Sequence, residues 1–413
     1  MSKLNKKAMI NEILKQLDIT PTMFKLAKER YTSVSKYLED NGIEAEFYPQ
    51  GSFRLGTVTR PIKKGKDSDY DIDFVCQIKG IRSEKDGTNE IEKIKNEVGD
   101  LLKENETYNK ILDDEGRRCW TLIYAEKDGI GFHLDILPSV SESDNKKREL
   151  NYKYGIPEKY VSTTIAITNK DDDQYTWCTS NPIGYSEWFN EINEPFYRMI
   201  QEQEKRALFE NYTDLYDSIE DVPDQLVKTP LQRVIQILKR HRDIRFSGKE
   251  DEKYKPISMI ITTLVAQVVK HYGISGLDTY NLLKCVVNKL DESINKIQNN
   301  NAEFGFIKRN QGTKEWYIPN PINPEENFAD KWSEDNNKRA EMFFTWIKYV
   351  NKDLIEQLKD DEVELDVLKA SFGQEICESA YSKYNLESNM LSENTTGPKL
   401  ITNPGSPWRK ING

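Results

Sequence analysis

The sequence contains few cysteines and histidines, and this scarcity narrows the kinds of site that it can hold. Its 413 residues include five cysteines and three histidines. No CxxC pair occurs, and no cysteine stands beside a histidine at the spacing of a structural zinc site. We therefore expect reduced, mostly buried thiols, as in cytoplasmic proteins, and no zinc domain.

Long apolar runs are lacking as well. No stretch approaches the ~20 apolar residues that a membrane helix needs. The N-terminal segment MSKLNKKAMINEILKQL has no continuous apolar stretch before a small-residue cleavage site, so it reads as an amphipathic helix and not as a signal peptide. We expect a cytoplasmic protein with no membrane partner.

An excess of basic residues is the third feature that is missing. The chain has 59 Lys and Arg against 69 Asp and Glu, which gives a net charge of −10. Proteins that track a polynucleotide usually carry a basic groove that binds the phosphates. The charge balance argues against nucleic acid as the main partner.

The order of the predicted elements indicates an α+β protein with two lobes, because 413 residues exceed what one compact core usually holds. We expect a lobe over residues 1–215, including two N-terminal helices at 3–17 and 20–40, a helical lobe over 216–389, and a flexible tail over 390–413. Alternating patterns predict strands at 67–75, 117–125 and 131–140 and a hairpin at 163–180. Helical periodicity marks 88–105, a helix from about 181 to 211, 229–246, 256–272, 277–296, 335–358 and 362–383.

Acidic residues alternate with bulky ones in DSDYDIDFV, residues 67–75. On a strand, Asp71 and Asp73 share one face, while Ile72 and Phe74 face the opposite way, into a core. A further acid, Asp135, stands in the apolar strand FHLDILPS. Grouped carboxylates need neutralisation, and a solvated strand face or an adventitious Ca²⁺ site is the simplest alternative to a functional metal site.

A phosphate-binding turn precedes the acidic strand. In QGSFRLG, Gly51 and Ser52 can present backbone N–H groups and a hydroxyl to a phosphate. Together with Asp71, Asp73 and Asp135, this turn fits a site for two Mg²⁺ ions, which prefer carboxylates together with substrate phosphates. Mn²⁺ has the same preference.

The register of the acidic strand has an alternative. Asp69 and Asp71 also form an acid-x-acid pair. We prefer Asp71 and Asp73, because Phe74 and Val75 continue the buried strand whereas Asp69 resembles the loop that leads into it.

These motifs together resemble a known superfamily. The pattern QGS…DYDIDFV…FHLDILPS resembles the nucleotidyltransferases of the DNA polymerase β type. The segment GSFRLGTVTRP and the long helical second lobe resemble those of the bacterial CD-NTases, relatives of cyclic GMP–AMP synthase and oligoadenylate synthase. The resemblance implies a bilobal fold, with a mixed or antiparallel sheet in the catalytic lobe and the active site in the cleft between the lobes.

The resemblance also implies an activity. CD-NTases are Mg²⁺-dependent enzymes that join nucleoside triphosphates, ATP commonly among them, into a cyclic di- or trinucleotide for antiphage (CBASS) signalling. Asp71, Asp73 and Asp135 would hold metal, and Gln50, Gly51 and Ser52 would hold the triphosphate. Some members are conjugated through their C-terminal residue, which a flexible end at Gly413 permits; a functionless end fits as well.

A cationic helix lies in the second lobe. The segment TPLQRVIQILKRHRDIRF contains Arg233, Lys239, Arg240, Arg242 and Arg245, which we interpret as a triphosphate clamp, with a solvated basic face as the alternative. The resemblance matches Lys239 and Ser258 to the family's triphosphate-binding lysine and serine. Ser258 also suits a plain helix start.

Two other functions remain open at this point. The first is transfer of a nucleotide to tRNA or to a protein, by a tailing enzyme or a toxin, and a basic RNA-binding surface would favour it. The second is a non-catalytic nucleotide-binding module, against which the intact acids and the Gly-Ser pair argue.

Overall fold

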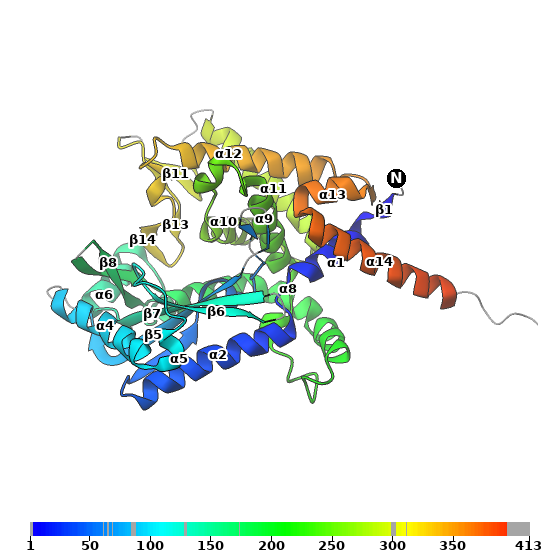
Figure 1. The fold of residues 1–413 in the computed structure, drawn as a ribbon. Helices are drawn as coiled ribbons and strands as arrows, with labels where there is room; N and C mark the ends of the chain where they lie inside the picture. The colour runs from blue at the N-terminus through cyan, green and yellow to red at the C-terminus, as the bar shows by residue number, and fades with distance from the viewer. Residues whose placement is uncertain are drawn as a thin grey trace, which may run out of the picture.

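The protein folds into a sheet lobe and a helical lobe, each with its own apolar core (Figure 1). The computed structural model describes residues 3–60, 62–63, 66–67, 69–83, 88–127, 130–172, 174–298, 303–310 and 312–394. The expected α+β class is confirmed. No described helix has the length and apolar content to cross a membrane.

The sheet lobe is built on a mixed six-stranded sheet of order β2-β5-β7-β8-β9, with β6 also paired to β7. The strands are β2 (Ala45–Pro49), β5 (Tyr70–Arg82), β6 (Trp120–Lys127), β7 (Ile130–Ser141), β8 (Ile165–Asp171) and β9 (Gln174–Ser180). Strands β5 and β7 run parallel, and the other pairs are antiparallel. The strands expected at 117–125 and 131–140 pair as the hairpin β6–β7, and the hairpin expected over 163–180 is confirmed as β8–β9.

Helices cover one face of this sheet. They are α2 (Pro21–Asp40), α4 (Thr88–Glu104) and α5 (Glu106–Asn109) (Figure 1). Helix α2 begins where Thr20 accepts a hydrogen bond from the backbone of Met23, and Pro21 follows in the first turn. Ile72 and Phe74 of β5 are buried in the same core as α2. The acids that alternate with them therefore face away from these helices.

The helical lobe surrounds α9. Its helices are α8 (Pro182–Asn211), α9 (Pro230–Phe246), α10 (Ser258–Tyr272), α11 (Thr279–Gln298), α12 (Lys338–Val350), α13 (Leu365–Phe372) and α14 (Gln374–Asn394). Helix α9 opens with a capping box between Thr229 and Gln232, and nearly all of its side chains are buried. The expected helix over 229–246 is confirmed.

Short elements complete the fold. They are β1 (Leu4–Asn5), α1 (Lys6–Leu17), α3 (Gly51–Arg54), β3 (Ile62–Lys63), β4 (Lys66–Asp67), α6 (Asp144–Tyr154), α7 (Glu158–Val161), β10 (Glu303–Phe304), β11 (Ile307–Arg309), β12 (Trp316–Tyr317), β13 (Pro319–Asn320), β14 (Asn323–Asn327) and β15 (Glu362–Val363). Three 3₁₀ turns lie at 224–226, 250–254 and 330–332.

The N-terminal helix α1 packs with the helical lobe, which differs from the expected grouping of both N-terminal helices in 1–215. Strand β1 pairs with β15, with Leu4 opposite Val363, and α1 lies beside α14 (Figure 1). Met9 and Ile13 are fully buried in the core of the helical lobe. This placement depends on pairing between the two ends of the chain, which local periodicity does not reveal.

Two predicted helices are interrupted. The segment 335–358 forms α12 and then a π-helix over Asn351–Glu356. The segment 362–383 divides into β15, α13 and α14, with a break at Gly373, whose φ is +96°. A Cβ at Gly373 would lie 2.8 Å from Cδ1 of Ile244, so a close approach to α9 requires glycine there.

The end of the chain also differs from expectation. Helix α14 continues to Asn394, beyond residue 390, where we expected a flexible tail to begin. Residues 395–413, including Gly413, lie outside the described residues.

The contact between α4 and the sheet predicts that replacing a helical glycine by alanine, which usually stabilises a helix, destabilises the protein at position 99. A Cβ at Gly99 would lie 2.2 Å from the buried ring of Trp120. Gly99→Ala should therefore lower the free energy of unfolding by about 1–3 kcal/mol, because overpacking outweighs the better helix propensity of alanine. Chemical denaturation measures this change, with the exposed Asp100→Ala as the control. A stabilised Gly99→Ala variant would show that the helix can shift away from the ring at little cost.

Candidate active site

Parallel pairing of β5 with β7 brings the three predicted acids to one region of the sheet. Asp73 stands directly opposite Asp135, and Asp71 stands opposite His133. The Asp135 carboxylate accepts a hydrogen bond of 2.6 Å from the Thr121 hydroxyl of β6. Residues 62 positions apart in the sequence are thereby neighbours across two strands.

Asp73 is the least compensated of these acids. Among the described residues, no side chain or backbone group forms an ion pair or hydrogen bond with its carboxylate. Burial, together with the nearby Asp135 and Asp71 carboxylates, raises the pKa of Asp73 to about 7, against the opposing charge of Lys239. Burial also raises the pKa of Asp135. A cation at this position would relieve both the repulsion and the cost of burial.

His133 lies between Asp69 and Asp71 of the DSDYDIDFV segment. Its Nδ1 is 3.3 Å from Asp71 Oδ1, and its Nε2 is 3.5 Å from Asp69 Oδ2. Asp69 precedes β5 and accepts a hydrogen bond from the backbone N–H of Gly131. Asp69 is thus already engaged in the loop that leads into the strand, which supports the choice of Asp71 and Asp73.

The Gly-Ser turn packs against Asp73. Helix α3 starts at Gly51 after Gln50, whose backbone N–H donates to the Asp73 carbonyl at 2.9 Å. Gly51 has a φ of +61°, and a Cβ there would lie 2.5 Å from Asp73 Oδ2. Any other residue at 51 would displace the carboxylate, so this turn and the acid form one unit.

A cavity of about 490 Å³ joins the turn, the acids and α9. Six of the predicted site residues line it: Gly51, Ser52, Asp71, Asp73, Lys239 and Ser258. The cavity lining does not include Gln50 or Asp135. Gln50 contributes its backbone to the turn, and Asp135 stands behind the cavity on β7.

Lys239 brings a buried ammonium group into this cavity. Its Nζ donates to the Thr57 carbonyl at 3.0 Å and to the Thr57 hydroxyl at 3.2 Å. No carboxylate among the described residues lies within ion-pair distance. Burial, together with the Arg242 charge, lowers the pKa of Lys239 to about 7. An anionic phosphate would restore the charged form.

Arg242 orients Ser258 at the start of α10. Its Nη1 donates to Ser258 Oγ at 2.9 Å and to the Pro256 carbonyl at 3.0 Å. Arginine has no acceptor, so the Ser258 oxygen accepts and its own O–H remains available to a phosphate. Asp243 pairs with Arg242 and, at 3.1 Å, with Lys255. Asp243 and Lys255 line the cavity and were missed in the sequence, where nothing distinguishes them from surface charges.

The predicted cationic clamp is narrower than expected. Lys239 and Arg242 line the cavity, but the other three cations of α9 have partners elsewhere. These are Arg233 with Asp18 at 2.7 Å, Arg240 with the Phe372 carbonyl at 2.8 Å, and Arg245 over the Tyr349 ring at 3.4 Å. The prediction was wrong for these three residues because their partners are distant in sequence.

Helix α9 and the residue before its cap also hold the backbone that follows the Gly-Ser turn. Five carbonyls accept hydrogen bonds from its side chains: Leu55 from Gln232 (2.9 Å), Gly56 from Lys228 (2.9 Å), Thr57 from Lys239 (3.0 Å), Val58 from Gln236 (2.9 Å) and Arg60 from Arg240 (3.4 Å). The position of the turn is therefore set by the helical lobe.

The residues fit a divalent metal by their chemistry. The described residues include no group of three His, Cys, Asp or Glu side chains already arranged around a metal position. The unpartnered Asp73 and the raised pKa values of Asp73 and Asp135 nevertheless indicate that negative charge is concentrated here without protein compensation. Hard cations such as Mg²⁺ prefer carboxylate oxygens of this kind.

Comparison with known proteins supports the same interpretation. Residues 45–138 match the family model of the DncV-like cyclic GMP–AMP synthase nucleotidyltransferase domain. A c-di-GMP synthase from Roseivirga ehrenbergii is 30% identical over 339 residues, covering 81% of this chain and 74% of that protein. The chain belongs to the bacterial CD-NTase family. It is a nucleotidyltransferase.

Other CD-NTases share its fold. The cyclic dinucleotide synthase CdnG of Bradyrhizobium diazoefficiens is 24% identical over 394 residues, covering 92% of this chain and 83% of that protein. A solved structure of the CdnG from that organism, in complex with GTP, has a TM-score of 0.65 at 21% identity and covers 92% of this chain and 98% of that one. The expected bilobal CD-NTase architecture is confirmed.

Because the ionised Asp73 carboxylate is buried without a partner, we expect it to lower the free energy of unfolding of the protein. Its pKa is about 7 in the folded protein against an ordinary value of 3.8, so the folded state binds the proton more tightly and loses stability as pH rises between these values. In metal-free buffer at pH 8, Asp73→Asn should raise the free energy of unfolding by about 1 kcal/mol or more.

Thermal unfolding at pH 5 and pH 8 tests this difference, and the exposed Asp114→Asn serves as the control. The gain for Asp73→Asn should be larger at pH 8 than at pH 5. An equal gain at both values would mean that charge on Asp73 is not the cause.

Proposed function

We propose that this CD-NTase joins two nucleoside triphosphates into a cyclic dinucleotide, with GTP as a substrate. The observation that carries the proposal is the meeting, in one cavity, of the unpartnered Asp73, the Gly-Ser turn and the buried Lys239. The names of the relatives, c-di-GMP synthase and cyclic dinucleotide synthase, favour GTP. ATP, which we expected among the substrates, is the second candidate.

The triphosphate would lie between the two lobes. Ser52 and the backbone of Gly51 would contact it from the sheet lobe, and Lys239 and Ser258 from α9 and α10. The hydroxyl that Arg242 leaves free on Ser258 would donate to a phosphate oxygen. Such convergent donors hold the phosphates in position for in-line displacement.

Asp135 would act on the acceptor nucleotide. In the proposed step, a ribose hydroxyl oxygen forms a bond to the α-phosphorus, the bond to pyrophosphate breaks, and the hydroxyl proton leaves to a base. The raised pKa of Asp135 suits it to receive that proton, and the Thr121 hydroxyl would orient its carboxylate. Repeating the step on the linear intermediate would close the ring.

Asp71, Asp73 and Asp135 would hold the divalent metal, which we propose to be Mg²⁺, as two ions, or Mn²⁺. When bound, the metal supplies charge neutralisation and a more acidic hydroxyl. His133, in contact with Asp71, would keep that carboxylate oriented.

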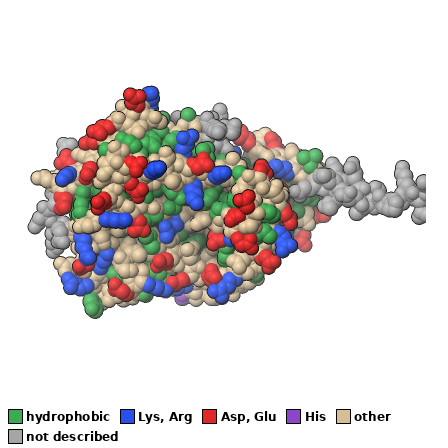
Figure 2. Space-filling view, turned by 90° about the horizontal axis from the view of Figure 1, so that it is seen from below, with side chains coloured by type: hydrophobic (Ala, Val, Ile, Leu, Met, Phe, Trp, Pro, Cys, Tyr) green, Lys and Arg blue, Asp and Glu red, His purple; other side chains and the backbone are tan. Residues whose placement is uncertain are grey.

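A role in antiphage (CBASS) signalling, and conjugation through Gly413, are proposed from the family resemblance. Transfer to tRNA or protein is a weaker candidate. On the face shown in Figure 2, acidic and basic side chains are interspersed, which does not offer a broad basic surface to RNA there.

Product analysis tests the proposed function directly. Purified protein with Mg²⁺ and labelled GTP alone should give a phosphatase-resistant product with the mass of a cyclic GMP dimer. One pyrophosphate should be released for each phosphodiester bond that forms. A product that needs ATP as well would revise the base choice. No phosphatase-resistant product from any of the four triphosphates, with label transferred to added tRNA, would overturn the proposal.

Asp71→Asn should reduce synthesis by about a thousandfold or more, because it removes a carboxylate that would hold metal at the reacting phosphate. The exposed position of Asp71 predicts that the melting temperature changes little. Asp172→Asn, in the β8–β9 turn, is the matched control and should retain full activity. Wild-type activity of Asp71→Asn would refute the metal assignment.

Arg242 should act as a positioning residue for Ser258. Arg242→Gln and Ser258→Ala should both raise KM for GTP, and the double variant should lose little more than either single one, because the two act through one hydroxyl. Arg242→Lys should partly restore KM. Fully additive losses would show that Arg242 acts independently of Ser258.

A further inference from the structure

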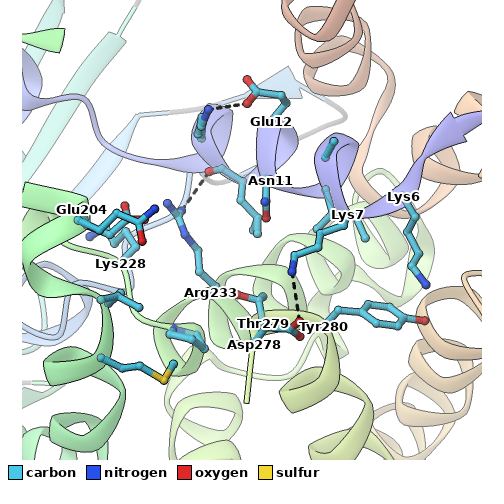
Figure 3. Close-up of a pocket in the computed structure, with 18 of the residues that line it drawn as sticks. Lys6, Lys7, Asn11, Glu12, Glu204, Lys228, Arg233, Asp278, Thr279 and Tyr280 are labelled. Atoms are coloured by element: carbon cyan, nitrogen blue, oxygen red, sulfur yellow. Dashed lines mark hydrogen bonds and ion pairs between the residues drawn. The ribbon is translucent and has the colours of Figure 1, made fainter. Parts of the chain in front are cut away.

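A second cavity, of about 820 Å³, lies away from the candidate active site. It is lined by α1, α8, the first turns of α9 and α11, and Tyr384 of α14 (Figure 3). Its volume is in the range of sites for small organic molecules. None of its lining residues also lines the active-site cavity.

Positive charge exceeds negative charge around this cavity. Its lining has five cations, Lys6, Lys7, Lys15, Lys228 and Arg233, and three acids, Glu12, Glu204 and Asp278. Arg233 is also paired with Asp18, which is not part of the lining, so with Asp18 counted the cations exceed the acids by one (5 − 4), in a chain whose net charge is −10. Glu12 is paired with Lys15, and Asp278 with Lys7 (Figure 3). The local field therefore favours an anion.

Lys228 is the lining cation best placed to bind such an anion. Its side chain is 5% exposed and lines the cavity. Two of its three N–H donors bind the carbonyls of Gly56 and Gln225, and the third has no protein acceptor among the described residues. No described carboxylate lies within ion-pair distance of it. A buried ammonium without a counter-charge is costly unless an anion accompanies it.

Apolar and aromatic side chains complete the lining. Ile10, Ile200 and Pro230 are accompanied by Met199, which is 51% exposed, and by Tyr280, whose ring carries Lys6 Nζ at 4.0 Å from its centroid. A ligand that combines an anionic group with a flat apolar body would satisfy both kinds of surface.

Lys228 also connects this cavity to the backbone that follows the Gly-Ser turn. Gly56, whose carbonyl accepts a hydrogen bond from Lys228, lies two residues after α3 (Gly51–Arg54). A Cβ on Gly56 would lie 2.6 Å from Gln232 Nε2. The backbone is thus pressed against the start of α9, and a shift of the Lys228 ammonium would move the turn that carries Ser52.

We propose that this cavity binds a small organic anion with a flat apolar body, through Lys228, and that its occupancy changes the affinity of the active site for the nucleotide. The binding part is independent of the proposed function, whereas the coupling part rests on it. Glu204, on α8 at the margin of the cavity, would limit the affinity by repulsion.

Anilinonaphthalene sulfonate, a fluorescent anion of this shape, is the probe. The wild-type protein should show one saturable site that excess GTP with Mg²⁺ does not displace. Asn11→Trp, which places an indole in the cavity from an exposed position of α1, should weaken binding about tenfold or more. Gln201→Trp, on the exposed face of α8 outside the cavity, is the matched control and should bind normally.

Charge variants test the recognition. Lys228→Met should weaken probe binding, and Glu204→Gln should strengthen it, since they remove charges of opposite sign. Equal binding in Asn11→Trp and Gln201→Trp, or displacement of the probe by GTP, would overturn the proposed site whatever the effect of Lys228→Met on folding.

Steady-state kinetics test the coupling. At saturating probe, KM for GTP should change about fivefold or more in the wild type and in Gln201→Trp, and not in Asn11→Trp. An unchanged KM in an active wild-type enzyme would overturn the coupling. A wild type that makes no phosphatase-resistant product from any of the four triphosphates without the probe would instead count against the proposed function and leave the fluorescence result to decide the binding site.

Discussion

The active site depends on the hydrogen bonds by which α9 holds the backbone after the Gly-Ser turn. Carbonyls from Leu55 to Arg60 would be costly to bury without donors, and the side chains of α9 and Lys228 supply those donors. The sheet lobe therefore cannot place Ser52 without the helical lobe. Because Lys239 both supplies one of these bonds and lines the cavity, the link between lobes and the nucleotide contact are a single feature of the structure.

Opposite charges face this junction without neutralising each other. Asp73 has a raised pKa and Lys239 a lowered one, and neither forms an ion pair with a described residue. If folding were the only requirement, an apolar residue at either position would give a more stable protein. A metal ion on the acids and a triphosphate on the lysine would remove both costs together, so the ligand and not the protein completes the electrostatics.

The parts of the site that are local in sequence were predictable. Alternation in DSDYDIDFV places Asp71 and Asp73 on one face, and the resemblance matches Ser52, Lys239 and Ser258 to known roles; all five line one cavity. The partners of α9 were not predictable, because Arg233 and Arg240 look like Arg242 in the sequence. Their difference is set by Asp18 and by the Phe372 carbonyl, which only the fold brings near. Likewise, α1 was assigned to the wrong lobe because its partner β15 is near the other end of the chain.

Two buried lysines connect the two cavities through the backbone that follows the Gly-Ser turn. Lys228 and Lys239 bind consecutive carbonyls of one turn: the first donates to the Gly56 carbonyl, and the second donates to the Thr57 carbonyl. Both are buried, and burial lowers the pKa of both. An anion beside either lysine draws its ammonium from a carbonyl of the shared turn, so binding in one cavity changes the geometry presented to the other. Coupling of this kind needs no large domain movement, because the two carbonyls belong to consecutive residues of one backbone segment.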